Sequence, residues 1–135
     1  MVFAISVRKA SAGIYDYGSD GGRAVWSGLS AEYPARDPRP DMQEIQRRLL
    51  HIQAIESIRA MEDGIIVNAS DADLGSVLGW AFPAHHGRVL SYVDGIGAGQ
   101  FAKECEALAE ICGDRFVPPS RLLAMAGSKE RFHEL

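Results

Sequence analysis

The 135-residue sequence lacks long hydrophobic runs, clustered basic residues and all but two cysteines. A membrane-spanning helix needs roughly 20 consecutive apolar residues, and no run in this chain approaches that length. Lys and Arg are scattered, the densest points are the pairs Arg8-Lys9 and Arg47-Arg48, and the formal net charge is -4. A general nucleic-acid binder usually presents a basic face. The composition therefore argues against membrane and nucleic-acid partners and favours a soluble globular protein, with 47% hydrophobic and 24% charged residues.

Features of a secreted protein are also missing. In residues 1–9 the charged residues follow the apolar ones, which is the wrong order for a secretory signal. Cys105 and Cys112 lie seven residues apart on one predicted helix, roughly 10 Å along its axis, which is too far for a disulfide. They fall on its apolar side, so we expect buried free thiols and a cytoplasmic location.

Motifs for catalysis, metal binding and cofactor binding are absent as well. The adjacent His85 and His86 point in different directions, whereas a zinc site needs three or four converging ligands. Residues 71–82 begin like a calcium loop, but they have Ser76 and Phe82 where that loop needs Gly and Glu. The glycines at 95–99 lack dinucleotide-loop spacing, and no Ser or Cys lies in a nucleophile elbow. We therefore predict no catalytic, cofactor-binding or metal-binding residue and assign the two histidines to a turn or an interface.

Residues 1–40 read as a linker with a small hairpin. Strand-like residues 14–17 and 23–26 flank a Gly-rich turn at 18–22, and the prolines at 38 and 40 make a stiff spacer. The aromatic side chains of this hairpin, including Tyr15 and Tyr17, are expected to pack on the helical part of the chain.

Residues 41–135 read as a helical domain. Asp41 and Glu44 have the spacing of a capping box that opens a helix to about residue 62, where Gly64 stops it. One apolar stripe of this helix consists of Met42, Ile45, Leu49 and Ile52, and a second consists of Leu50, Ala54, Ile58 and Met61. Two stripes predict two packing partners, which makes this the central helix of the bundle.

Four shorter helices are expected after the central one. Ser70 caps a helix over 71–78, with Asp71 and Asp73 at its positive N-terminal end. Further helices are expected at 87–93 and 98–112, and the last starts at about 118–120. In the 98–112 helix the acidic residues and Lys103 lie opposite an apolar line of Phe101, Cys105, Leu108 and Cys112. The fold class is thus all-α, a bundle of about five helices preceded by a short β-hairpin and linker.

Blocks of sequence along nearly the whole chain resemble one known family. They are residues 8–17, 46–56, 62–66, 71–76, 79–83, 91–94, 115–119 and 131–132. In this order and spacing the chain resembles the C-terminal domain of 3-hydroxyacyl-CoA dehydrogenases. It is most similar to the second C-terminal helical repeat of the multifunctional fatty-acid β-oxidation enzymes, with the linker before it. The sequence departs from the family at Ser11, Ala12 and Ile14, and at residues 85–88, where the family usually has Trp, Thr and two glycines.

The resemblance implies a domain without catalysis of its own. In the family, NAD and the catalytic His–Glu pair belong to a Rossmann domain, and the hydratase glutamates belong to another fold. The implied partners are therefore the Rossmann and hydratase domains of the parent enzyme, in cis or in trans. The candidate interface or structural residues are Tyr15, Tyr17, Trp80, Phe82, Pro83, His85, His86 and Gly87.

Two alternatives stay open. A free-standing module would form a homodimer or bind a dehydrogenase subunit through the two-sided helix at 41–62. An independent acyl-CoA binder is disfavoured, because basic residues for the CoA phosphates do not cluster.

Overall fold

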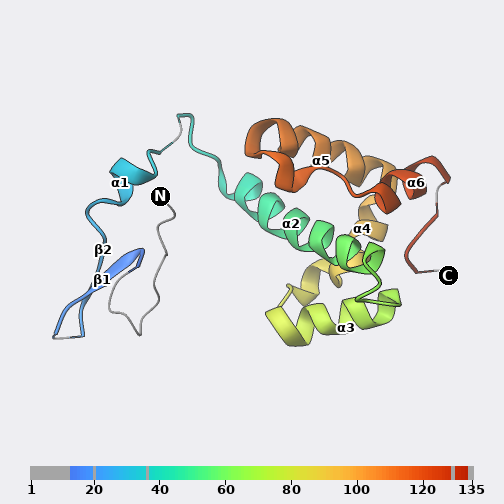
Figure 1. Cartoon of the computed structure of the whole chain (residues 1–135), viewed down its shortest axis with the longest axis horizontal. Helices are drawn as coiled ribbons and strands as arrows, with labels where there is room; N and C mark the ends of the chain where they lie inside the picture. The colour runs from blue at the N-terminus through green and yellow to red at the C-terminus, as the bar shows by residue number, and fades with distance from the viewer. Residues whose placement is uncertain (1–12, 20, 36, 129, 134–135) are drawn as a thin grey trace. The chain divides into compact units, whose positions relative to one another are not determined.

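The computed structural model describes residues 13–19, 21–35, 37–128 and 130–133. The chain divides into two compact units, residues 1–40 and residues 41–135 (Figure 1). Residues 1–12 lie outside the described residues. They include the apolar N-terminal segment and the family-like residues 8–12, with the departures Ser11 and Ala12.

The first unit contains the predicted hairpin. Strands β1 (Tyr15–Tyr17) and β2 (Arg23–Val25) pair antiparallel, with Asp16 opposite Ala24. The turn closes through hydrogen bonds from the Gly18 N–H to the Gly22 carbonyl and from the Gly21 N–H to the Gly18 carbonyl. Gly21 takes a φ of 79° that favours glycine. A short helix, α1 (Leu29–Glu32), follows and was not predicted. None of the residues described in this unit is buried, so the hairpin contributes no core of its own.

The second unit is the predicted helical bundle. Its α-helices are α2 (Met42–Glu62), α3 (Ala69–Trp80), α4 (Val89–Ile96), α5 (Ala98–Cys112) and α6 (Ser120–Ser128). Two 3-10 turns, η2 (Ala84–His86) and η3 (Asp114–Phe116), precede α4 and α6. Within this unit α5 lies beside α6, and α4 packs against α2, α3 and α5 (Figure 1). No helix among the described residues is both long and apolar enough to cross a membrane.

Side-chain caps explain where two of the helices begin. The carboxylate of Asp41 accepts a hydrogen bond from the Glu44 N–H at 2.8 Å, as predicted. The other half of the capping box is absent, because the Glu44 carboxylate pairs with Arg48 one turn further along. The α3 prediction was wrong in its cap. Asn68, in extended conformation, accepts from the Asp71 N–H at 2.8 Å, and the helix starts before Ser70.

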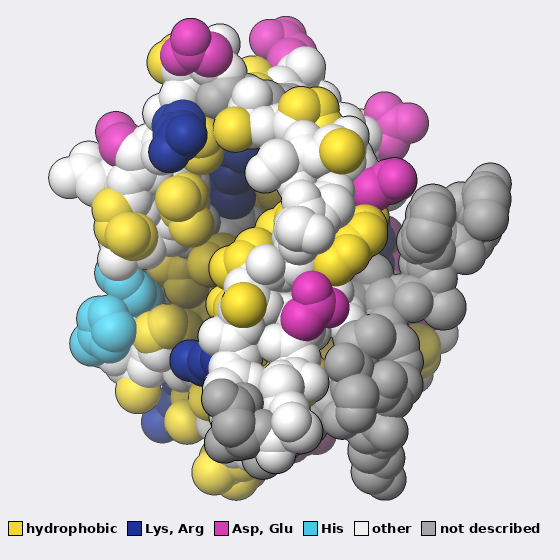
Figure 2. Space-filling model, turned by 90° about the vertical axis from the view of Figure 1, so that its left-hand side faces the viewer, with side chains coloured by type: hydrophobic (Ala, Val, Ile, Leu, Met, Phe, Trp, Pro, Cys, Tyr) yellow, Lys and Arg dark blue, Asp and Glu magenta, His cyan; other side chains and the backbone are white. Residues whose placement is uncertain are grey.

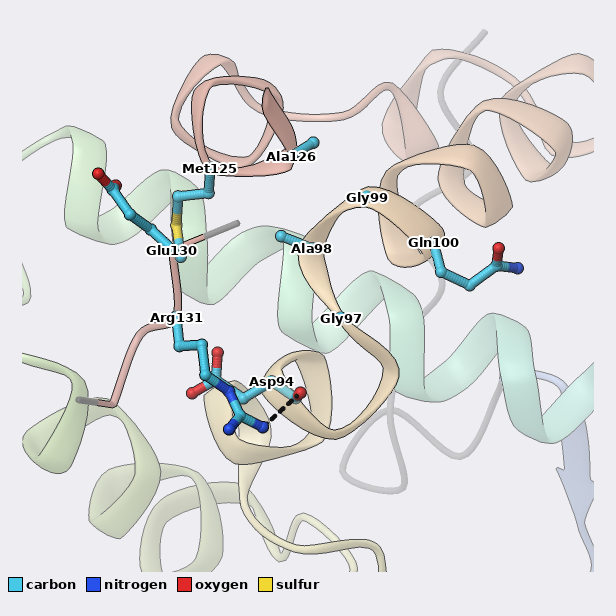
Figure 3. A pocket seen from close by; sticks show the side chains of 9 residues that line it. All are labelled: Asp94, Gly97, Ala98, Gly99, Gln100, Met125, Ala126, Glu130 and Arg131. Carbon is cyan, nitrogen blue, oxygen red and sulfur yellow. Dashed lines mark hydrogen bonds between the residues drawn. The ribbon is translucent and has the colours of Figure 1, made fainter. Parts of the chain in front are cut away.

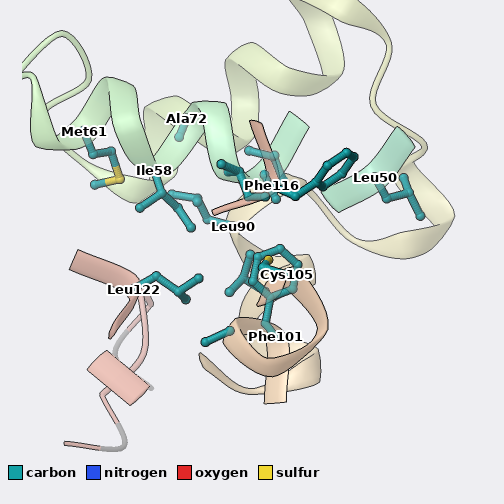
Figure 4. Packing of buried hydrophobic residues seen from close by; sticks show 14 of the residues in the cluster. Leu50, Ile58, Met61, Ala72, Leu90, Phe101, Cys105, Phe116 and Leu122 are labelled. Carbon is teal, nitrogen blue, oxygen red and sulfur yellow. The ribbon is translucent and has the colours of Figure 1, made fainter. Parts of the chain in front are cut away.

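The hydrophobic core lies between α2, α4 and α5 and is closed by side chains of α3, η3 and α6 (Figure 4). From α2 it takes the inner stripe, defined as Leu50, Ala54, Ile58 and Met61, all at most 7% exposed. The outer stripe is defined as Met42, Ile45, Leu49 and Ile52. Its first three side chains are 66%, 38% and 57% exposed. The helix packs on α4, η3 and α6 through the inner stripe, whereas of the outer stripe only Ile52 is half-buried against the core.

Candidate interface site

Two aromatic residues at the turn after α3, Trp80 and Phe82, lie in different environments. Ala81 takes a left-handed φ of 57°, and the Phe82 N–H donates back to the Ser76 carbonyl at 2.9 Å. The left-handed residue ends α3 and turns the chain back toward the helix. Phe82 is accordingly 2% exposed, whereas Trp80 is 47% exposed. Phe82 is thus a core residue, and Trp80 is available at the surface.

The histidine pair follows directly in η2. The rings of His85 and His86 lie 4.3 Å apart, and His86 contacts the Tyr92 ring edge-on at 6.3 Å. Both are exposed, and Figure 2 shows histidine side chains at the surface beside hydrophobic ones. Gly87 takes a φ of 90°, which L-residues rarely adopt. In the part of the chain that the structure describes, no group of three or more His, Cys, Asp or Glu side chains could hold a metal ion.

An open apolar groove of about 630 Å³ runs along α2 next to Trp80. Ile52, Ala60, Ile66 and Trp80 supply its apolar lining, with Gln53, Glu56 and Ser57 at its polar edge. The outer stripe shares Ile52 with the groove and extends from it toward the start of α2. The sequence indicated the stripe through its spacing, but the contributions of Ile66 and Trp80 depend on tertiary structure. Tyr15 and Tyr17 lie in β1 of the first unit, and their packing on the helical unit stays a prediction.

A buried carboxylate joins α3 to α4. Asp73, 1% exposed, accepts from the Leu90 N–H at 2.7 Å and from the Ser91 hydroxyl at 2.5 Å. These donors lie in the first turn of α4, whose own N-cap residue, Arg88, makes no side-chain cap. Asp73 therefore caps the neighbouring helix α4. The sequence pattern had instead placed it at the N-terminal end of its own helix.

The same carboxylate and Asp94 hold the C-terminal segment. The His133 ring donates to Asp73 at 2.9 Å, and the N–H groups of Phe132 and His133 donate to Asp94. Arg131 reaches the Asp94 carbonyl at 3.1 Å beside a pocket of about 360 Å³ (Figure 3). In this view the Gln100 side chain points away from Arg131. Residues 131–133 are thus tied to α3 and α4 by polar contacts that sequence spacing did not reveal.

A second polar cluster joins α2, α4 and α5. The fully buried His51 places Nε2 3.0 Å from the Glu104 carboxylate and Nδ1 3.3 Å from the Tyr92 hydroxyl. Its ring stacks on Phe101 at 4.4 Å. The prediction that Glu104 lies on the solvent side of its helix was therefore wrong, because the carboxylate turns inward to the histidine.

Burial keeps these groups in their neutral forms. It lowers the pKa of His51, against the opposing effect of Glu104. It raises the pKa of Tyr92 to about 12 and that of the Cys105 thiol to about 12, with Glu104 adding to both. Cys105 and Cys112 are free thiols, the first buried and the second half-buried. A protonated, buried thiol is a poor nucleophile, so this cluster lacks an activated group for covalent catalysis.

The described residues contain no strand-to-helix dinucleotide loop of the Rossmann type. A dinucleotide loop joins a parallel β-strand to a helix, whereas the glycines at 95, 97 and 99 lie where α4 meets α5. The sheet in the described part of the chain consists of two antiparallel strands of three residues each.

Comparison with known proteins gives relatives along almost the whole chain. The fatty acid oxidation complex subunit alpha of Shewanella loihica is 30% identical over 131 residues, and that of Shewanella oneidensis is 33% identical over 129 residues. These matches cover 94% and 93% of this chain but only 18% of each relative. No family model matches the chain. M. tuberculosis FadB2 matches in structure with a TM-score of 0.56 and 23% identity, over 65% of this chain and 32% of that one.

The fold and the site together define a helical domain with an exposed apolar face on α2. At 23% identity the FadB2 match supports this fold alone. The curated relatives go further: along almost its whole length the chain is similar to a C-terminal part of fatty acid oxidation complex alpha subunits, of which it spans less than a fifth. The resemblance to the C-terminal helical domain of the β-oxidation dehydrogenases is thereby confirmed.

Proposed function

We propose that this chain acts as a structural C-terminal domain of a 3-hydroxyacyl-CoA dehydrogenase in fatty-acid β-oxidation. In this proposal the parent enzyme performs the NAD-dependent oxidation in the cytoplasm, and the chain supports it without binding NAD. Residues 1–40 serve as the linker, and residues 41–135 serve as the packing domain. The observation that carries the proposal is the match to alpha subunits over 93–94% of the chain and 18% of the relatives.

The exposed apolar surface of α2 supports a packing role. The outer stripe and the groove beside Trp80 form one continuous apolar region through Ile52. Large contiguous apolar patches on a folded domain mark interaction sites more often than chance exposure does. In this proposal the region packs on the other domains of the parent enzyme, either in one chain or between chains.

A second candidate function rests on the same surface. As a free-standing module, the chain would pair with a second copy of itself, so that the two outer stripes cover each other. A strictly monomeric solution mass at high concentration argues against this alternative and leaves the domain function in place.

Enzyme assays test the first proposal. The purified chain is mixed with NADH and acetoacetyl-CoA, and a complete alpha subunit serves as the positive control. We expect no oxidation of NADH by this chain, because its described residues supply no dinucleotide loop. Turnover that persists through purification to homogeneity would contradict the proposal.

A further inference from the structure

We propose that His51 is an acid-sensitive switch of the fold, whose protonation breaks its contact with Tyr92, places a charge in the core and loosens α2 from α4. The inference rests on the interior of the helical unit and does not depend on the proposed function. It concerns a buried histidine at the meeting point of three helices, held by one polar contact to each of two neighbouring helices.

The hydrogen bonds define which ring nitrogen carries the proton. A carboxylate can only accept, so the Nε2 atom 3.0 Å from Glu104 must donate. The neutral ring then has a lone pair on Nδ1, which accepts from the Tyr92 hydroxyl at 3.3 Å. Both nitrogens are satisfied in the neutral form. A second proton on Nδ1 removes the acceptor of Tyr92 and adds a charge to a site with no exposed surface.

The charged and titratable groups around the ring act in opposite directions. Glu104, on α5, favours the protonated ring. On α2, the backbone carbonyl of Arg47 also favours the protonated ring, whereas the Arg47 guanidinium disfavours it. From α4, Tyr92 stays neutral because its pKa is raised to about 12. The largest effect is burial, which lowers the pKa of His51 below its ordinary 6.5. The ring is therefore neutral at pH 7 and gains its proton only below pH 6.5.

The Nε2 side of this ring lies close to solvent. Glu104 is a quarter exposed and lines a surface cavity of about 400 Å³ together with Glu44, Arg47 and Lys103. The carboxylate thus connects the cavity to Nε2 of the histidine. Loosening at His51 also reaches the corner after α3, because the Tyr92 ring contacts both Phe82 and His86.

The sign of the effect follows from proton linkage. A folded-state pKa below the unfolded value means that the unfolded chain binds the extra proton more readily. Stability due to neutral His51 is complete above pH 6.5 and falls as the pH drops from 6.5 toward the folded-state pKa. Within that window one proton changes the ratio of folded to unfolded chain by up to about tenfold for each pH unit.

Urea unfolding of the whole chain between pH 8 and pH 5 tests the switch, with His51→Gln as the variant and His86→Gln as the control at an exposed histidine. We expect the folded fraction of the unaltered chain and of His86→Gln to fall as the pH drops below 6.5. His51→Gln should remove that dependence, because it leaves no titrating ring in the core. The same pH dependence in His51→Gln as in the unaltered chain overturns the proposal.

Nuclear magnetic resonance of the histidine ring nitrogens gives a reading on the unaltered protein, which is decisive where His51→Gln does not fold. We expect His51 to carry its proton on Nε2 at pH 7 and to titrate below pH 6.5. The signals of Tyr92 and Phe101 should shift with the same midpoint. A His51 that titrates at or above pH 6.5, or that titrates without any change at Tyr92, overturns the switch.

Discussion

The two apolar stripes of α2 have similar composition and opposite environments. The inner stripe lies in the core, with Ala54 and Ile58 fully buried, whereas Met42 and Leu49 on the outer stripe are more than half exposed. The inner stripe is covered by elements of this chain, because α2 contacts α4, η3 and α6. One side of α2 is therefore buried by other elements of this domain, and the other side leaves apolar side chains exposed where a partner could pack.

The largest expected effect comes from breaking the inner stripe. Ile58→Ala removes three buried carbons from the centre of the core and leaves a cavity between α2 and its neighbours. We expect a loss of about 2–5 kcal/mol in the free energy of unfolding. Urea denaturation at pH 7.5, above the titration range of His51, measures it. A loss below about 1 kcal/mol would show that α2 is not anchored through this stripe.

A polar contact on the covered side should matter nearly as much. Asp73→Ala leaves the Leu90 N–H and the Ser91 hydroxyl without their buried acceptor and releases His133. We expect a loss of about 1–3 kcal/mol, together with faster hydrogen exchange at the start of α4. Asp71→Ala is the matched control, because that exposed residue lies on the same helix. Equal losses in the two variants would contradict the role of Asp73 as a cap for α4.

The smallest effect on stability is expected on the outer stripe. Leu49→Ala shortens a side chain that is 57% exposed, so the free energy of unfolding should change by about 0.5 kcal/mol or less. The same denaturation experiment checks this value beside Ile58→Ala. A loss as large as that of Ile58→Ala would mean that the outer stripe is covered within this chain, and the distinction between the stripes would fail.

Local sequence signals were sufficient for much of the fold. The limits of α5 followed from its apolar line, and the start of α2 followed from Asp41. The hairpin followed from its Gly-rich turn. Each of these elements is decided by residues close together in the chain, which is why spacing predicts them.

Contacts between distant residues were beyond such signals. Asp73 looked like an acidic residue at its own helix start, and only the packing of α3 on α4 shows that it caps the other helix. Glu104 looked like part of a solvated face until its contact with His51, 53 residues earlier, was seen. The outer stripe was found from its spacing, but a periodic pattern shows that a face is apolar and not whether the same chain covers it.

The central claim is that the outer stripe of α2 is a docking surface for the remaining domains of an alpha subunit. Titration calorimetry of this chain against an alpha subunit lacking the matching C-terminal part tests it most directly. We predict saturable binding that is abolished by Leu49→Asp, an outer-stripe change, and retained by Glu110→Gln on the exposed side of α5. Absence of binding by the unaltered chain, or equal binding by both variants, would contradict the account.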